Sequence, residues 1–462
     1  MRIEEEYVKT GYFWLPENED RKIPGTLTIS NGGDIELEVV GLFDESIQAI
    51  NGNDDLSRII GHIEKDGLVT LDNCFYTKKN ISFGGISKSK VCVNRVLSGA
   101  AYDKDEPVTF NSLSFSVDCF DEWVGISGIK VNNDRENKTA DITYKPPENI
   151  DYQLDNGMLL AICFAYALPG FPNTTEAKIT QRAYFKLVSE DLRSLGDFTE
   201  VAYKLTNLMC FAIDTTVTLN NLIATSSEIQ REISEGRRHP VPIRIYYPSI
   251  PFSEEVPKKS FHQMLFSYRA ITSNAQDVFN NWINAYEIIA PALSLYFSTK
   301  IGAQKYLDGK FLALAQGLET YHRRTSDEKL MDSNEFESLV SEIIKACPEQ
   351  NLEWLKGRLM HGNEINLGKR LKRIIEPFKD KLGNSKERNS LLRKIVDTRN
   401  YLTHYNEDLK DSAAQGSELR GLCQKMEAIF QLHFLKVIGF SDEEISAVIK
   451  NCYPLKRKLS EI

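Results

Sequence analysis

The first part of the chain alternates apolar and polar residues over short stretches. Ile35, Leu37 and Val39, for example, alternate with two glutamates. A period of two predicts a β-strand with one buried face, and Gly-, Asn-, Asp- and Lys-rich turns separate the stretches. Similar stretches occur at residues 25–29, 68–71, 91–96 and 113–117. Many short strands between turn signals predict an antiparallel sandwich or barrel up to about residue 145.

Further elements extend this β-rich region towards residue 250. Two longer apolar segments predict more deeply buried strands, helical spacing predicts one helix, and a short strand closes the region. These elements are residues 158–168, 183–188, 197–213 and 242–247. Residues 248–259 then contain three prolines and several charges. That composition is typical of an interdomain linker.

Beyond this segment apolar residues recur every third or fourth position, which predicts helices. The expected helices are residues 278–297, 306–322, 334–346, 352–360, 371–382, 386–405, 417–438 and 442–450, with a break or kink at Pro291. The sequence therefore predicts an α+β chain of two domains. We expect a β-rich, sandwich-like domain at residues 1–250, a linker at 251–260 and an all-α bundle at 261–462.

Composition and charge agree with this division. The chain has 462 residues, of which 42% are hydrophobic and 26% charged, as expected for a globular protein with at least two cores. The formal net charge of -9 argues against a protein covered in basic surface for indiscriminate nucleic-acid binding. The acidity lies before residue 262, with 27 Lys and Arg against 39 Asp and Glu, whereas the remainder has 29 against 26. Any contact with nucleic acid is therefore expected in the second half.

Cysteine spacing and hydropathy predict a cytoplasmic protein. The eight cysteines are scattered, with no CxxC pair and no zinc spacing, so we predict buried thiols in a reducing compartment and no metal site. The first residues are acidic and do not form a signal peptide. The longest apolar run, residues 158–168, is too short to cross a bilayer, so no membrane partner is expected.

The candidate chemistry lies in the sequence RNYLTH, residues 399–404. It falls near the end of the helix predicted at 386–405, which Asn384 or Ser385 would cap. Asn400 and His404 lie one turn apart, nearly opposite the apolar stripe, and Arg399 projects from the flank. The apolar stripe is expected to contain Leu391, Ile395, Leu402 and Tyr405. An arginine, an amide and an imidazole can then converge outside the helix surface, a grouping that suits a scissile phosphate in RNA.

RNYLTH, within TRNYLTHYNE and behind an acidic β-rich front half, resembles the ApeA anti-phage defence family. The C-terminal domain of that family is a HEPN domain, a helical bundle found in many prokaryotic toxins and defence ribonucleases. Its motif is an arginine, a polar residue, three variable residues and a histidine, which Arg399, Asn400 and His404 match without departure. The resemblance covers the whole chain, with the HEPN part from about residue 261.

The resemblance implies an abortive-infection endoribonuclease that acts as a homodimer or higher homo-oligomer. Two motif helices would meet at a two-fold axis, and one His404 would act as the base while the other acts as the acid, because imidazole titrates near neutrality. Arg399 would stabilise the phosphorane, and Asn400 would orient the phosphate or the imidazole. The scheme requires no metal and no other cofactor. The expected substrate is host RNA, with tRNA among the candidates, and a phage-derived trigger would act through the N-terminal domain.

A basic stretch precedes the motif and supports an anionic substrate. Residues 356–394 contain 12 basic residues against 4 acidic ones. Lys386, Arg388, Arg393 and Lys394 are its candidate RNA-binding residues. The alternative is a solvated pair of helices. Tyr401 and Tyr405 are candidates for stacking on a base, although the position of Tyr405 on the apolar stripe favours core packing.

Three alternatives remain open at this point. The polar residues of the motif are also compatible with an ordinary solvated helix face. A second alternative is a non-catalytic dimerisation or interaction protein of the HEPN type, in which the same polar face completes a dimer and the β-rich domain binds a ligand. A carbohydrate-active protein is the weakest alternative, because Trp14 and Trp123 are its only supporting residues and no carboxylate pair has a recognisable spacing.

Overall fold

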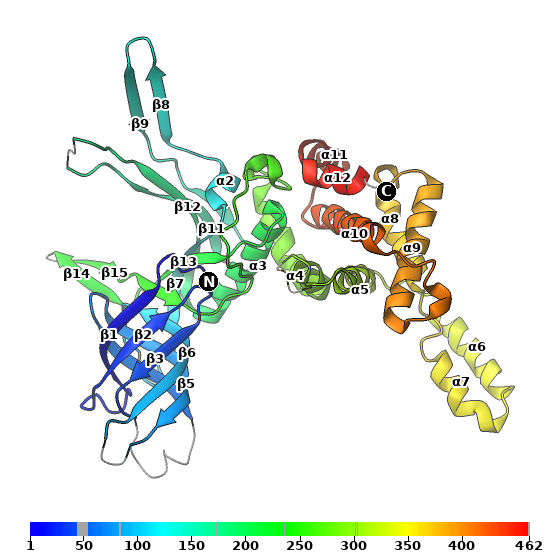
Figure 1. The fold of residues 1–462 in the computed structure, drawn as a ribbon, viewed down its shortest axis with the longest axis horizontal. Coiled ribbons are helices and arrows are strands. Elements are labelled where there is room, and N and C mark those ends of the chain that lie inside the picture. Colours follow the sequence, from blue (N-terminus) through cyan, green and yellow to red (C-terminus); the bar gives the residue numbers. More distant parts are fainter. Residues whose placement is uncertain are drawn as a thin grey trace. The chain divides into compact units, whose positions relative to one another are not determined.

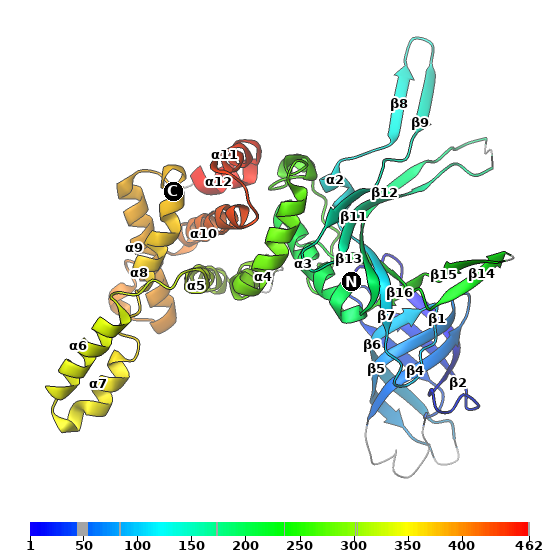
Figure 2. The same ribbon diagram turned by 180° about the vertical axis from the view of Figure 1, so that it is seen from behind.

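The computed structural model describes residues 1–43, 54–82, 85–171, 174–234, 236–300, 302 and 304–460. It consists of two compact units, Met1–Ile283 and Asn284–Ile462. The first unit is rich in strands and the second is helical, which confirms the predicted α+β class (Figures 1 and 2). The domain limits predicted from the sequence, residues 250 and 261, lie before this division and stay a prediction.

Six strands of the first unit close into a barrel, one of the two predicted arrangements. The strands are β1 (Tyr7–Trp14), β2 (Ile23–Ile29), β3 (Ile35–Val39), β4 (Asp55–Ile63), β5 (Gly67–Asn80) and β6 (Lys88–Ser98). Each pairs with its neighbour in the antiparallel order β6-β3-β2-β1-β4-β5, and β5 pairs back with β6. Phe13, Leu27, Leu37, Val69 and Val91 are fully buried within this cluster. Alternation along each strand supplies these residues, as the sequence predicted.

Glycines allow the barrel wall to close tightly. A Cβ atom at Gly11 would lie 2.4 Å from the His62 carbonyl oxygen, and one at Gly61 would lie 2.6 Å from the Phe13 ring. Both positions face neighbouring strands with no room for a side chain. The small residues therefore let the strands bend around the buried Phe13 ring.

The sheet continues beyond the barrel through β6. Its remaining strands follow the order β16-β13-β7-β12-β11-β10. They are β7 (Thr109–Val117), β10 (Ile150–Gln153), β11 (Leu159–Ala167), β12 (Thr180–Ser194), β13 (Leu219–Thr225) and β16 (Ile243–Tyr246). Helix α3 (Leu195–Ile213) packs on β7 and β12, and a capping box between Ser194 and Asp197 starts it. A short helix, α2 (Phe120–Val124), packs on β12.

Two hairpins stand outside this sheet. They are β8 (Ile129–Asp134) with β9 (Thr139–Tyr144), and β14 (Gln230–Ser234) with β15 (Arg237–Pro240). The first projects from the unit in Figure 1 and has no buried residue. Hairpins of this kind add no core, so hydrophobic patterning did not predict them.

The segment predicted as a linker is bonded to the first unit. The guanidinium of Arg2 donates to the carbonyl oxygens of Glu254 and Glu255 at 3.0 and 3.3 Å. The Cys119 thiol lies 3.0 Å from the carbonyl oxygen of Pro257. Glu254, Glu255 and Pro257 are therefore held against the first unit, and a linker at residues 251–260 stays a prediction.

The second unit is formed by helices, as predicted. They are α4 (Ala275–Ser298, which begins in the first unit), α5 (Leu307–Thr325), α6 (Ser333–Lys345), α7 (Leu352–Leu359), α8 (Leu367–Ile375), α9 (Ser385–His404), α10 (Gly416–Val437), α11 (Asp442–Asn451) and α12 (Tyr453–Ser460). α4 continues through Pro291, so the helix has no break there, and the alternative prediction, a kink, stays a prediction. Ile289 and Leu293 are buried on either side, and this packing outweighs the hydrogen bond that proline removes.

Helix α10 is the centre of the helical core. Met426, Ile429, Phe430 and Phe434 on α10 are completely buried, and α10 packs against α5, α11 and α12. α8 and α9 pack on α5 in turn. α6 and α7 contact each other but contain no buried residue, and Figure 1 shows them projecting from this unit. The compact bundle therefore excludes two of the predicted helices. Among the described residues, no helix is long and apolar enough to cross a membrane.

Candidate active site

Helix α9 carries the motif in its last two turns. The Asn384 side chain accepts hydrogen bonds from the backbone N–H groups of Lys386 and Glu387 at 2.9 and 3.0 Å, and Glu387 accepts one from the Asn384 N–H. This capping box starts the helix at the predicted residue. At the other end Tyr405 adopts the left-handed conformation with φ of 49°. The helix therefore ends immediately after His404.

The core face of α9 is opposite His404. Ile395, Thr398 and Leu402 are buried, whereas His404 is exposed. The Thr398 hydroxyl accepts a hydrogen bond from the Ala414 N–H at 2.9 Å, which fixes the chain as it returns after the helix. Within the part of the chain that the structure describes, no hydrogen bond or ion pair to His404 is found. Its imidazole is therefore available to a ligand or a partner.

Tyr405 does not belong to the core stripe, so the prediction of core packing is wrong. Its side chain is 65% exposed. The left-handed backbone turns this residue away from the direction that helical periodicity assigns to it. Its ring meets the Tyr401 ring edge to face, with the centroids 5.6 Å apart. The two tyrosines form an aromatic pair at the end of the motif helix.

The structure brings Arg399 and Asn400 together. Arg399 Nη1 donates to Asn400 Oδ1 at 3.3 Å, and Arg399 Nη2 lies 4.0 Å from Glu319 Oε2 on α5. The arginine side chain is 36% exposed. No hydrogen bond joins either residue to His404 within the described ranges. One copy of the motif therefore presents an arginine–amide pair and a separate histidine.

The four candidate RNA-binding residues fall into two pairs. Lys386 and Arg393 are exposed. Arg388 donates to the carbonyl oxygens of Lys379 and Gly383, and Lys394 pairs with Glu418 at 3.1 Å. Lys386 and Arg393 therefore offer their charge to solvent, whereas Arg388 and Lys394 are engaged with the protein.

The basic stretch as a whole carries less free charge than its composition suggests. Arg370 is only 2% exposed, bonds to Glu364 at 2.5 Å and lies 3.3 Å from His322 Nδ1. Arg373 forms a fork with Glu328, its shortest contact being 2.7 Å. These arginines are paired with carboxylates inside the helical unit and support its structure. Charge counts along a sequence did not show this, because they do not reveal which side chains are paired.

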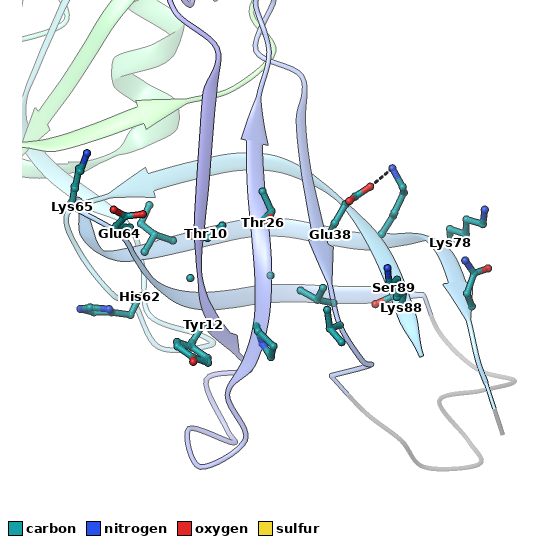
Figure 3. Close-up of a pocket in the computed structure, with 18 residues that line it drawn as sticks. Thr10, Tyr12, Thr26, Glu38, His62, Glu64, Lys65, Lys78, Lys88 and Ser89 are labelled. Atoms are coloured by element: carbon teal, nitrogen blue, oxygen red, sulfur yellow. Dashed lines mark ion pairs between the residues drawn. The ribbon is translucent and has the colours of Figure 1, made fainter. Parts of the chain in front are cut away.

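A hollow lies on the barrel of the first unit. It has a volume of about 740 Å³, and Figure 3 shows residues that line it. Lys65, Lys78 and Lys88 line it together with Glu38 and Glu64. The Glu38 carboxylate is bonded to the Lys90 ammonium, as the dashed line shows. The lining thus carries charges of both signs, and it includes no residue of the motif.

Sequence reasoning missed one residue next to the motif, Glu319. Glu319 forms an ion pair at 2.9 Å with Arg323, four residues further along α5. Its approach to Arg399 joins residues 80 positions apart, and no local pattern signals such a contact.

A β-rich unit followed by a helical unit, with an outward arginine, polar residue and histidine on one helix, is the arrangement of a HEPN-domain defence protein. Two family models agree with this class: ApeA N-terminal domain 1 matches residues 8–282, and Apea-like HEPN matches residues 312–444. The chain belongs to the ApeA family. No curated protein and no solved structure matches it.

The family assignment sets the general function. The chain fits a family of anti-phage HEPN nucleases, and HEPN domains are generally ribonucleases that dimerise and bind RNA. Helix α9 with its complete motif lies inside the HEPN match. The predicted resemblance, which rested on the motif and on strand patterning, is confirmed for both parts of the chain.

Proposed function

We propose that the chain is an abortive-infection endoribonuclease that cleaves host RNA with Arg399, Asn400 and His404. The observation that carries the proposal is the placement of the motif: His404 is exposed without a partner among the described residues, on the face of α9 opposite its buried residues. Arg399 and Asn400 are bonded to each other and only partly buried, so both still have hydrogen-bonding groups to offer a substrate. The charge and hydrogen-bonding groups they offer match a phosphodiester.

The reaction is an internal transesterification. A base removes the 2'-hydroxyl proton, the 2'-oxygen attacks phosphorus, and an acid gives a proton to the departing 5'-oxygen. The products are a 2',3'-cyclic phosphate and a free 5'-hydroxyl. The Arg399 guanidinium offsets the negative charge of the phosphorane, and Asn400, bonded to it at 3.3 Å, helps to orient it. DNA lacks the 2'-hydroxyl and is not cleaved.

Two copies of the chain complete the site. One α9 supplies one histidine, but the reaction needs a base and an acid at opposite sides of the phosphate. A two-fold axis beside the exposed end of α9 brings a second His404 to the same phosphate. One imidazole then accepts the proton of the 2'-hydroxyl while its symmetry mate, protonated, donates to the leaving oxygen.

The remaining roles follow from charge and exposure. Lys386 and Arg393 contact the RNA backbone, and the rings of Tyr401 and Tyr405 stack on a base beside the scissile phosphate. Structured RNA such as tRNA is the substrate class we propose. The β-rich part, residues 1–250, senses a phage-derived trigger and controls the nuclease at residues 261–462.

The test is cleavage of RNA by the purified full chain in the presence of EDTA, followed by analysis of the product ends. Wild type is expected to release 2',3'-cyclic phosphates. His404→Ala is expected to abolish cleavage and to leave thermal stability unchanged, because the side chain is exposed. His361→Ala is the matched control, since His361 is an exposed histidine of the same unit.

Two results would reject the assignment. Cleavage that persists in His404→Ala would remove this residue from the reaction. Wild type that cuts no RNA, combined with motif variants that change only the oligomeric mass, would favour the non-catalytic interaction protein.

A further inference from the structure

Glu319 lies on α5 with its carboxylate between two arginines. Glu319 Oε2 is 4.0 Å from Arg399 Nη2. Glu319 Oε1 accepts hydrogen bonds from Arg323 Nε and Nη2 at 3.2 and 2.9 Å. The Glu319 side chain is 19% exposed, about half the exposure of Arg399. The carboxylate is therefore largely shielded and faces the catalytic candidate from a neighbouring helix.

The far side of Glu319 is held without any help from Arg399. Arg323 bonds to Glu364 at 2.7 Å as well as to Glu319. Glu364 in turn bonds to Arg370 at 2.5 Å and to Lys329 at 2.6 Å. This series of alternating charges fixes the orientation of the Glu319 carboxylate. The orientation of the Glu319 carboxylate therefore does not depend on Arg399, and Glu319 can restrain the more flexible Arg399 side chain.

The Arg399 side chain needs a neighbour that restrains its orientation. Its side chain is long and partly exposed, and ordering a side chain of this kind during the reaction costs conformational entropy. Asn400 accepts from Nη1, and Glu319 faces Nη2. Arginine has five N–H donors in a planar fork, so two neighbours orient the guanidinium and still leave donors for a phosphate.

We propose that Glu319 is a positioning residue that keeps the Arg399 guanidinium oriented for the scissile phosphate. This inference rests on the proposed ribonuclease function. Glu319 acts through Arg399 and does not itself touch the RNA. Its contact at 4.0 Å is longer than a hydrogen bond, so the carboxylate orients the arginine without taking a donor from the substrate.

The test compares Glu319→Gln with wild type and with Glu328→Gln. Glutamine keeps the shape of the side chain and removes its charge. Glu328 also forms a fork with an arginine, Arg373, and has no contact with Arg399 among the described residues. We expect the kcat for RNA cleavage to fall about 10-fold in Glu319→Gln, with KM nearly unchanged, because the misplaced arginine weakens the transition state more than substrate binding. Glu328→Gln is expected to keep the wild-type rate.

A double-mutant comparison separates positioning from a general effect on the fold. In an Arg399→Ala background, Glu319→Gln should cause no further loss of the residual rate. An equal 10-fold loss in that background would overturn the proposal. A rise in the rate of Glu319→Gln would also overturn it, because Glu319 would then restrain Arg399 instead of orienting it.

A structural measurement keeps this proposal separate from the ribonuclease assignment. Crystal structures of wild type and Glu319→Gln should show one conformation of Arg399 in wild type and several conformations in the variant. The same single conformation in both proteins would overturn the positioning role, whether or not the chain cleaves RNA. Loss of cleavage in Glu319→Gln but undiminished cleavage in Arg399→Ala would instead reject the catalytic role of Arg399 and, with it, this proposal.

Discussion

Charged and polar side chains are exposed on one face of α9, whereas around Glu427 of α10 they are buried and paired with one another. On α10, the Glu427 carboxylate is 5% exposed and is paired with Lys300, Lys310 and Lys458 at 3.3, 2.6 and 3.4 Å. Burial alone would raise the pKa of Glu427, but the three lysines lower it to about 2. The charges of this cluster are therefore paired with one another inside the protein and are not available to a ligand. On α9, by contrast, His404 faces solvent without a partner among the described residues.

The histidines show the same difference. His433 on α10 is buried, and its Nε2 lies 2.8 Å from the Ile374 carbonyl oxygen. Burial lowers the pKa of His433 to about 4, so it is neutral at physiological pH and serves the core. His404 is exposed and has no bonded neighbour within the described ranges. Polar residues that are both buried and paired stabilise the unit, whereas the candidates for chemistry on α9 are exposed or partly exposed.

Two arginines provide the largest test of this comparison. Arg399→Ala should lower RNA cleavage by about 10²- to 10³-fold, because it removes charge that stabilises the transition state. It should change the free energy of unfolding by less than about 1 kcal/mol, since its pair with Glu319 is partly exposed. Arg370→Ala should do the reverse, with a loss of about 3 kcal/mol of stability, because it removes a buried partner of Glu364.

Chemical denaturation and RNA cleavage measured on the same preparations check this prediction. Arg370→Ala that remains folded at low denaturant should still cleave RNA. Equal losses of stability in both variants would contradict the division between structural and catalytic arginines.

Acidification tests the buried side of the comparison. The folded state holds His433 with a pKa of about 4, against 6.5 for an unperturbed histidine, so the unfolded chain binds the proton first as pH falls. Stability is therefore fully present above pH 6.5 and is lost between pH 6.5 and 4, by roughly 3 kcal/mol. Glu427 adds a second loss between pH 4.5 and 2, since its pKa in the folded state is below its ordinary value.

Urea unfolding measured across this pH range should show the two losses. His433→Gln should remove the dependence that His433 contributes and keep the loss at lower pH. Burial also lowers the pKa of His322, so a small dependence below pH 6.5 should remain in the variant. An unchanged loss between pH 6.5 and 4 in His433→Gln would contradict this role of His433.

The smallest expected effect concerns Lys386 and Arg388. Lys386→Ala should weaken RNA binding a few-fold and reduce the salt dependence of the affinity by about one ion, because an exposed lysine contacts a phosphate. Arg388→Ala should cost about 1 kcal/mol of stability, because Arg388 bonds to the carbonyl oxygens of Lys379 and Gly383. Fluorescence anisotropy at several salt concentrations measures the first effect. Identical salt slopes for wild type and Lys386→Ala would remove Lys386 from the RNA-binding surface.

Local patterns in the sequence predicted the elements that depend on local physics. The strand at Ile35–Val39 has the predicted bounds because its alternation is regular, and α9 starts at Asn384 because a capping box is a local signal. The motif residues could be assigned to one helix face for the same reason. The two-unit α+β class followed from the change of hydrophobic period.

Features that depend on distant contacts were not predictable. Closure of the barrel needs β5 to pair with β6 and β1 with β4, and alternation does not specify a strand's neighbour. Arg370 is buried by residues of other segments, although its sequence neighbours are charged. The approach of Glu319 to Arg399 depends on how α5 and α9 pack. Tyr405 was misplaced because the helix ends one residue earlier than expected.

The most direct test of the composite site is the activity of a dimer with one wild-type chain and one His404→Ala chain. Two different affinity tags, used in succession, isolate this heterodimer from cells that express both chains. If one histidine is the base and the other the acid, one substitution removes a required group from the shared site, and the heterodimer should be as inactive as the His404→Ala homodimer. A heterodimer with about half of the wild-type activity would contradict the account, because each chain would then contain a complete site.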